Sequence, residues 1–141
     1  MYGLPMSIET ERIKVTLRAF SKEEVVAFVP YFNSMRVHMY TAGMWSQTVE
    51  NELKWHEKNM TEYDSAVWAV VPDGETEPVG VTSLHKIADV FGSCSSGYIC
   101  YKPEWWNKGV ASAAHLARTL AAADFYNRNT INSSARADNP G

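Results

Sequence analysis

Cysteine is scarce in this sequence: its 141 residues include two, Cys94 and Cys100. Two such thiols indicate neither a disulfide framework nor a metal site, so we expect free thiols, no bound metal and a cytoplasmic location. Long apolar runs are also missing. The longest, Ala66 to Val71, is far shorter than the roughly 20 residues that cross a bilayer. No basic patch followed by an apolar core opens the sequence, so we expect neither a signal peptide nor a membrane partner.

The overall charge is also small. A net charge of −3 disfavours nucleic acid as a partner and is compatible with a cationic amine. Hydrophobic residues make up 45% and charged residues 21% of the chain, which is typical of a globular protein. Neither an internal repeat nor the G-K-[ST] sequence of a P-loop is present, so residues 1–141 are expected to form a single domain.

The first half of the chain predicts a strand followed by two helices. Residues 13–19 alternate partly and contain β-branched residues, which favours a strand. Ser21 and Glu24 form a capping-box pattern before a helical run that reaches Phe32, and Pro30 is expected to split or kink that helix. Ser46 is the expected cap of the second helix, whose apolar face would contain Val49, Leu53, His56 and Met60.

The second half predicts three strands, a long helix and a last strand. Residues 65–71 and 79–84 flank a segment rich in turn formers and read as a hairpin, and residues 97–101 form the next strand. A helix is expected from residue 110 to about 126, with one face made of Val110, Ala113, Ala114, Ala117, Ala121 and Phe125. With a final strand at residues 131–137, this order predicts an α+β domain.

The passage from the third strand into the long helix contains the segment that is most informative about function. Gly109 and small residues leave the first amide groups of the helix uncovered, and these amides and the helix dipole suit phosphate oxygens. Lys108 would add a full positive charge. From the spacing alone, an ordinary loop in which Gly109 merely eases a turn explains the segment equally well.

This segment resembles a loop of known function. Trp106 to Ala111 is similar to the acetyl-CoA loop of the GNAT family of N-acetyltransferases, Q/R-x-x-G-x-G/A. Gly109 and Ala111 fill two marked positions, and Trp106 stands where Gln or Arg is usual. The RimJ/RimL-like branch, with W-G-K-G-x-A, is more similar still. Residues 10–13 with 17–18 resemble the opening strand of that branch, and residues 78–84 resemble its central strand. Together the three matches cover roughly residues 7 to 139.

The resemblance implies a fold, a co-substrate and binding residues. The fold would be the GNAT acyltransferase fold, a mixed, mostly antiparallel sheet flanked by helices, and acetyl-CoA would be the co-substrate. Its pantetheine arm would lie along the backbone of Ile99, Cys100 and Tyr101. The cofactor loop would comprise Asn107, Lys108, Gly109, Val110, Ala111, Ser112 and Ala113. In the family the connection between the first two helices, here residues 39–45, often lines the acceptor site, so the acceptor would meet Tyr40 and Trp45 of this loop and also His85. A core role explains the aromatic residues of the loop equally well.

The proton acceptor is less clearly indicated. Related enzymes often have a glutamate two residues before the Gly-Tyr of the strand, and this chain has Ser95 there. Serine is too weak a base to deprotonate an ammonium group, although it can hold a water. His85 is a second candidate and Tyr98 a candidate proton donor to the thiolate, while solvation and packing are the ordinary roles of such residues. We expect proton loss through water, without a single indispensable base.

The end of the sequence falls within a family motif. In the family an N-x-x-S turn, a further helix and further strands follow the last predicted strand, and Asn139-Pro140-Gly141 begins such a turn. We therefore expect the chain to be truncated, with a final strand that is free to pair with a second copy in a homodimer.

These patterns leave three functions open. The first is acetyl-CoA-dependent transfer to a primary amine, with a protein N-terminal α-amine slightly favoured. A small amine such as an aminoglycoside, a polyamine or an amino acid is the second acceptor class. The third is a non-catalytic acyl-CoA-binding or interaction module, which Ser95 and the missing C-terminal part favour.

Overall fold

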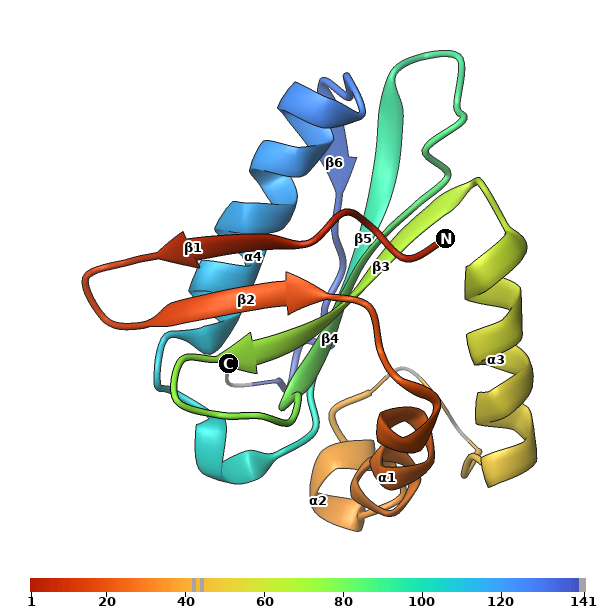
Figure 1. Cartoon of the computed structure of the whole chain (residues 1–141), viewed down its shortest axis with the longest axis vertical. Coiled ribbons are helices and arrows are strands. Elements are labelled where there is room, and N and C mark those ends of the chain that lie inside the picture. The colour runs from red at the N-terminus through yellow and green to blue at the C-terminus, as the bar shows by residue number, and fades with distance from the viewer. Residues whose placement is uncertain (42, 44, 140–141) are drawn as a thin grey trace.

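The computed structural model describes residues 1–41, 43 and 45–139. These residues form a six-stranded sheet whose strands lie in chain order (Figure 1). The strands are β1 (Met6–Glu9), β2 (Lys14–Arg18), β3 (Ser65–Pro72), β4 (Gly80–His85), β5 (Ser93–Cys100) and β6 (Thr130–Asn132). Neighbouring strands are antiparallel except β5 and β6, which are parallel. The predicted α+β architecture with a mixed, mostly antiparallel sheet is confirmed.

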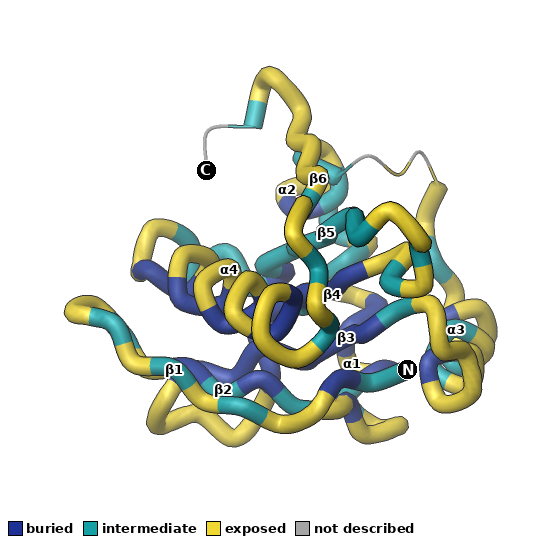
Figure 2. Tube along the Cα trace, turned by 90° about the horizontal axis from the view of Figure 1, so that it is seen from above, coloured by how far each residue is buried: buried dark blue, intermediate teal, exposed yellow. Residues whose placement is uncertain are grey.

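Helices cover both faces of the sheet. They are α1 (Lys22–Phe32), α2 (Met35–His38), α3 (Val49–Thr61) and α4 (Val110–Leu120), with short turns η1 (Pro103–Trp105) and η2 (Ala121–Phe125). Helix α4 contacts β1 to β4 on one face, whereas α1 and α3 contact each other on the opposite face. Figure 2 shows the buried residues along the central strands and on the inner side of α4.

The inner face of α4 is made of small residues, as the sequence predicts. Val110 and the predicted alanines are buried against the sheet, together with Trp68 of β3. The prediction that Phe125 belongs to this buried face is wrong, since Phe125 is 60% exposed. The helix widens into the π-helical turn η2, which shifts the side-chain positions, so that Ala122 faces the core instead.

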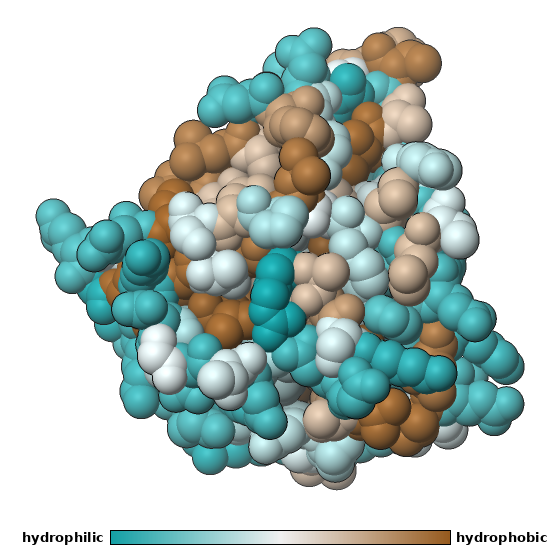
Figure 3. All heavy atoms as spheres, in the orientation of Figure 1, coloured by the Kyte–Doolittle hydropathy of each residue, from teal (hydrophilic) through white to brown (hydrophobic). Residues whose placement is uncertain are grey.

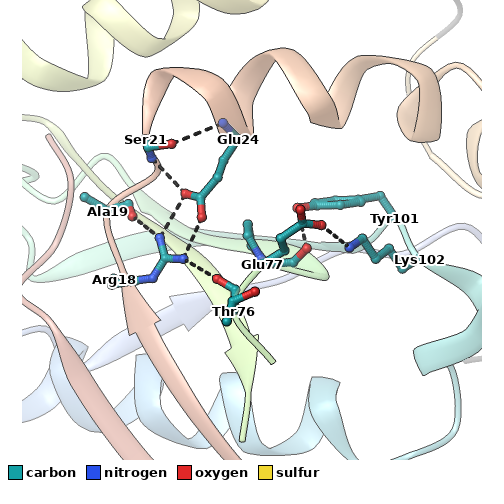
Figure 4. A network of polar contacts seen from close by, with 9 residues as sticks. Arg18, Ala19, Ser21, Glu24, Thr76, Glu77, Tyr101 and Lys102 are labelled. Atoms are coloured by element: carbon teal, nitrogen blue, oxygen red, sulfur yellow. Dashed lines mark hydrogen bonds and ion pairs between the residues drawn. The ribbon is translucent and has the colours of Figure 1, made fainter. Parts of the chain in front are cut away.

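The start of α1 is fixed by a polar network that Figure 4 shows. Ser21 and Glu24 form the predicted capping box. Arg18 also donates to both carboxylate oxygens of Glu24, at 2.9 and 2.6 Å. Burial acts to raise the pKa of Glu24, but the hydrogen bonds from Arg18 and Ser21 outweigh it and lower that pKa. Pro30 does not split the helix as expected, because α1 continues through Pro30 and ends at Phe32.

Helix α3 departs from the prediction in its cap and in its buried face. Thr48, not Ser46, is the cap, and its hydroxyl accepts a hydrogen bond from the Asn51 N–H at 3.1 Å. Val49 and Met60 are exposed, while Glu52 and Asn59 are buried. Residues 52, 55, 56 and 59 also recur at helical spacing. Packing against α1 and against the rings of Tyr2 and Phe20 selects this more polar stripe.

Three strand boundaries also need correction. Strand β5 begins at Ser93, four residues before its predicted start at Gly97, and β6 ends at Asn132 instead of Ala137. Residues 10–13, interpreted as part of an opening strand, form the turn between β1 and β2. The family turn expected at residues 139–141 includes Pro140 and Gly141, which lie outside the described residues.

Candidate functional site

Strands β5 and β6 part soon after they begin to pair. Their parallel register covers Ser93 to Ser95 of β5 and Thr130 to Asn132 of β6. Beyond it, the hydroxyls of Ser96 and Ser133 hydrogen-bond, and β5 then runs on to Cys100. On that stretch β5 is paired with β4 alone among the described residues. Its outer edge therefore offers backbone groups to an extended ligand.

The loop before α4 has two residues in the left-handed region. Asn107 has φ +60° and Gly109, the N-cap of α4, has φ +86° and ψ 0°. The first turn of α4 contains no acidic residue. Since the first amides of a helix have no partner within the helix, this loop presents donors to an anion. The Ala113 N–H is already used, because it donates to Gly109 O at 3.0 Å.

Trp106 links this loop to β5 and to the region around α2. Its indole Nε1–H donates to Cys100 O at 2.8 Å. The guanidinium carbon of Arg36 lies 5.3 Å from the centre of the indole, and the Tyr40 ring meets it edge-on at 5.9 Å. Lys108 Nζ lies 5.1 Å from the centre of the neighbouring Trp105 ring. The aromatic pair before the loop thus fixes it on both sides.

The three residues assigned to the pantetheine arm, two at the end of β5 and one directly after it, differ in their surroundings. Tyr101 is buried: its ring lies 4.6 Å from that of Phe28, and its hydroxyl donates to Pro78 O at 2.9 Å. The Tyr101 N–H is directed to β4, where it donates to Val79 O. Cys100 lies on the α4 side, and burial raises the pKa of its thiol to about 11. Ile99 packs on the opposite side with Phe28.

His85 and Ser95 come together on the face opposite α4. They are direct cross-strand partners of β4 and β5, so their side chains share a face. His85 Nε2 also lies 2.9 Å from the hydroxyl of Ser83. Gly97 is opposite Ser83, and a Cβ there would lie only 2.7 Å from that hydroxyl oxygen. Partial burial lowers the pKa of His85, although Asp64 opposes the shift.

Tyr98 lies on the other face of the sheet. Its cross-strand partner is Thr82, and its ring meets His115 of α4 at 5.0 Å. The Tyr98 hydroxyl is buried and has no hydrogen-bond partner in the described part of the chain. Arg118, which is 3% exposed, donates to Thr82 Oγ1 and Gly97 O nearby. Alternation along β5 thus separates Tyr98 from His85 and Ser95.

The predicted acceptor residues Tyr40, Trp45 and His85 have different surroundings. Tyr40 lies against Trp106, Trp45 is 77% exposed, and His85 stands at the end of β4. The loop that was expected to admit the acceptor includes Ala42 and Met44, which lie outside the described residues.

Two surface hollows are lined by residues other than Tyr40, Trp45 and His85. One, of about 260 Å³, lies between residues 4–6 and the end of α4. The other, of about 200 Å³, lies between α1 and residues 77–78 and contains Lys102. Figure 3 shows apolar surface over the end of α4 and the loop between β4 and β5, where Leu120, Phe125, Val90 and Phe91 are exposed.

Neither a metal site nor a membrane span is found in residues 1–41, 43 and 45–139. These residues hold no group of three or more His, Cys, Asp or Glu side chains placed to bind a metal ion. None of their helices combines the length and the apolar character that crossing a bilayer requires.

Three residues of this region were not predicted from the sequence. Ser83 could have been found, since it is two residues before His85 and therefore on the same strand face. Arg118 lies one position after the alanine stripe, but nothing in the helical pattern marks it as buried. Arg12 Nη2 donates to Asn107 O at 2.6 Å across a separation of 95 residues, and no local signal indicates that contact.

Comparison with known proteins identifies the family. Residues 14–141 match the acetyltransferase (GNAT) domain. No curated protein matches the sequence. A Mycobacterium smegmatis RimJ structure, in complex with CoA-disulfide, has a TM-score of 0.78 at 16% identity, and the match covers 96% of this chain and 69% of RimJ.

Two further structures share the fold. A putative ribosomal-protein-serine acetyltransferase from Vibrio cholerae has a TM-score of 0.74 at 18% identity, covering 95% of this chain and 76% of that protein. A chimera of spermidine N-acetyltransferase SpeG from Vibrio cholerae and hSSAT has a TM-score of 0.71 at 16% identity, and the match covers 84% of this chain and 69% of the chimera. The domain match over nearly the whole sequence shows that this chain belongs to the GNAT family and is an acetyltransferase.

Proposed function

We propose that the protein moves an acetyl group from acetyl-CoA to a primary amine, as a RimJ/RimL-like member of the family. The observation that carries the proposal is the left-handed loop at the start of α4 beside the outer edge of β5. Uncovered helix amides suit a diphosphate, and a strand edge suits the amide groups of a pantetheine arm. RimJ, which shares this fold, is in complex with CoA-disulfide.

The diphosphate would lie against the amides of Lys108 to Ser112. Ala113 drops out of this set, because its N–H is engaged by Gly109 O. No acidic side chain stands in the first turn of α4, so nothing there opposes an anion. The Lys108 side chain, seated over Trp105, would add positive charge on the same side.

The pantetheine arm would use the outward groups of β5. The N–H and C=O of one strand residue point to the same side, and the side alternates along an antiparallel pair. Since the backbone N–H of Tyr101 points to β4, the backbone groups of Cys100 and Tyr98 point to the outer edge of the sheet. Cys100 O already accepts from Trp106, which leaves the Cys100 N–H and the Tyr98 backbone for the cofactor.

The chemistry needs a neutral amine and a stabilised carbonyl oxygen. The amine nitrogen attacks the thioester carbon, the C–N bond forms, and the C–S bond breaks as the electron pair returns to sulfur. A backbone N–H of β5 would stabilise the oxyanion. The proton leaving nitrogen would pass through water beside His85 and Ser95, and thiolate sulfur is protonated in turn. The lowered pKa of His85 keeps its imidazole neutral near pH 7, as a proton acceptor requires.

The acceptor is an N-terminal α-amine of a protein in our first proposal and a small amine in the second. The fold neighbours include a ribosomal-protein-serine acetyltransferase and a spermidine acetyltransferase, so they support both. An α-amine has a pKa of about 7.7–8.0, against about 10.4 for a lysine side chain. At neutral pH much more of the α-amine is neutral, which favours it where proton loss is left to water.

Thiol release from acetyl-CoA tests the proposal directly. The matched acceptors are a peptide with a free N-terminus, the same peptide with a blocked N-terminus and an internal lysine, and spermidine. We expect turnover with the free N-terminus to exceed turnover with the lysine peptide and to rise with pH up to the pKa of the amine. Spermidine as the better acceptor would support the second proposal.

A non-catalytic acyl-CoA-binding module would give the opposite result. Calorimetry would then detect CoA binding, but no acceptor would release thiol. The homodimer and the cytoplasmic location stay predictions, and sedimentation of the purified chain tests the first of them.

A further inference from the structure

Arg12 joins the turn between β1 and β2 to the loop before α4. Thr10 holds the turn through bonds from its N–H and hydroxyl to Ile13 O. From this turn Arg12 Nη2 donates to Asn107 O at 2.6 Å. Its stem also covers Gly109, where an added Cβ would lie 3.1 Å from Arg12 Cβ. A residue far away in sequence therefore touches both left-handed positions of the loop.

This contact fixes the direction of one peptide group. The bond between Asn107 and Lys108 is trans, and in a planar trans peptide the C=O and the following N–H point in opposite directions. Because the Asn107 C=O points toward Arg12, the Lys108 N–H of the same peptide group points away from Arg12. Asn107 also has φ +60°, a left-handed conformation that asparagine adopts more readily than most residues but less readily than glycine. A charge-assisted hydrogen bond stabilises this conformation.

The charge of Arg12 is not neutralised by a carboxylate. Across the described residues, the ion pairs of the chain involve Arg18, Lys58, Lys102 and Arg136, and Arg12 is not among them. A guanidinium has five N–H donors, and one bond of the Arg12 side chain is directed to the loop. Arg12 therefore adds a full positive charge at the positive end of α4.

We propose that Arg12 is a positioning residue for the diphosphate of CoA. It holds the Asn107 carbonyl so that the Lys108 N–H faces the phosphates, and its charge lowers the free energy of the bound anion. This inference rests on the proposed function. Arg12 takes no part in the acyl-transfer step itself, so its loss acts on cofactor binding.

Arg12→Ala, Arg12→Lys and the control Lys14→Ala test the proposal. Lys14 is an exposed cation two residues away, so its loss reproduces the change in net charge. We expect Arg12→Ala to raise the Kd for CoA and the KM for acetyl-CoA about tenfold or more, the value of one charge-assisted hydrogen bond, with kcat within about twofold. Arg12→Lys keeps the charge but not the planar guanidinium, so its Kd and KM should lie between those of the wild type and those of Arg12→Ala. Lys14→Ala should match the wild type.

Two measurements separate positioning from a general structural role. Turnover of S-acetylpantetheine, which has no diphosphate, should be the same in Arg12→Ala and the wild type. Adding Asn107→Gly to Arg12→Ala should recover part of the lost CoA affinity, because glycine adopts the left-handed conformation without help.

Each contrary result has a distinct meaning. Unchanged CoA affinity in folded Arg12→Ala overturns the inference, and so does an equal loss with S-acetylpantetheine. Failure of Asn107→Gly to recover any affinity removes the positioning role. If the wild type does not bind CoA at all, the proposed function fails and this inference with it.

Discussion

Gly109→Ala is the sharpest test of the loop before α4. Gly109 has φ +86° and ψ 0°, and an L residue held in this left-handed region costs about 1–2 kcal/mol relative to its ordinary conformations. The new Cβ would lie 3.1 Å from Arg12 Cβ. Arg12 Cβ is bonded directly to the backbone of the turn between β1 and β2, so that turn or the loop must shift by a few tenths of an ångström, and the backbone cost of about 1–2 kcal/mol is a lower bound.

This free energy must appear either in stability or in binding. If the loop keeps its conformation, the folded state loses about 1–2 kcal/mol, which lowers Tm by roughly 3–8 °C in a chain of this size. If the loop relaxes in the free protein, CoA has to restore the left-handed conformation, and the same free energy raises Kd about 5- to 30-fold. Gly109→Val, with a β-branched side chain, should weaken CoA binding more than about tenfold.

Gly74→Ala is the matched control. Gly74 has φ +84°, and an added Cβ there would have no atom within 4 Å. It carries the same backbone cost in the loop between β3 and β4, so Tm should fall similarly while Kd stays unchanged. Thermal unfolding and calorimetry with CoA measure the two quantities. The assignment of the phosphate loop is refuted if Gly109→Ala alters neither.

Four other variants and one control address the remaining chemistry and stability. His85→Ala and Ser95→Ala should each reduce kcat by less than the roughly 100-fold at the low end for a true general base; a loss of 1,000-fold or more in His85→Ala with CoA binding intact makes His85 the base. Burial and repulsion by Arg118 lower the pKa of His115, so below about pH 6.5 the unfolded state binds more protons. The free energy of unfolding should therefore decrease as the pH is lowered from 8 to 5.5, and it should decrease less in His115→Gln than in the wild type. An identical decrease in the two proteins contradicts this prediction. Glu24→Gln removes the carboxylate charge and replaces one of the two oxygens that accept from Arg18 with an NH2 group, so it should cost about 1.5–3 kcal/mol in urea unfolding. Glu23→Gln, at the exposed neighbour, should change little.

The sequence by itself determined the features whose causes are local. The capping box of Ser21 and Glu24 needs two residues three positions apart, and it forms as predicted. The hairpin of β3 and β4 is predicted by turn formers between two apolar runs. The start of α4 is predicted by Gly109, which lies where the strand pattern changes into a helical pattern. In each case neighbouring residues set the backbone conformation, so spacing carries the information.

Packing decided the features that were predicted wrongly. The apolar spacing of α3 favoured a face with Val49 and Met60, but the helix buries Glu52 and Asn59. A helix turns to fit its neighbours, and a short stretch of sequence does not specify which neighbours these are. Strand β6 ends at Asn132 because pairing with β5 ends there, and pairing is a property of two segments.

Tertiary structure also decided how the site is assembled. Register places His85 beside Ser95 and turns Tyr98 to the opposite face; the sequence named all three but could not group them. The contact between Arg12 and Asn107 spans 95 residues, and no local pattern encodes it. Local sequence fixes which backbone groups a loop can offer, whereas the side chains that orient those groups come from wherever the sheet brings another turn alongside.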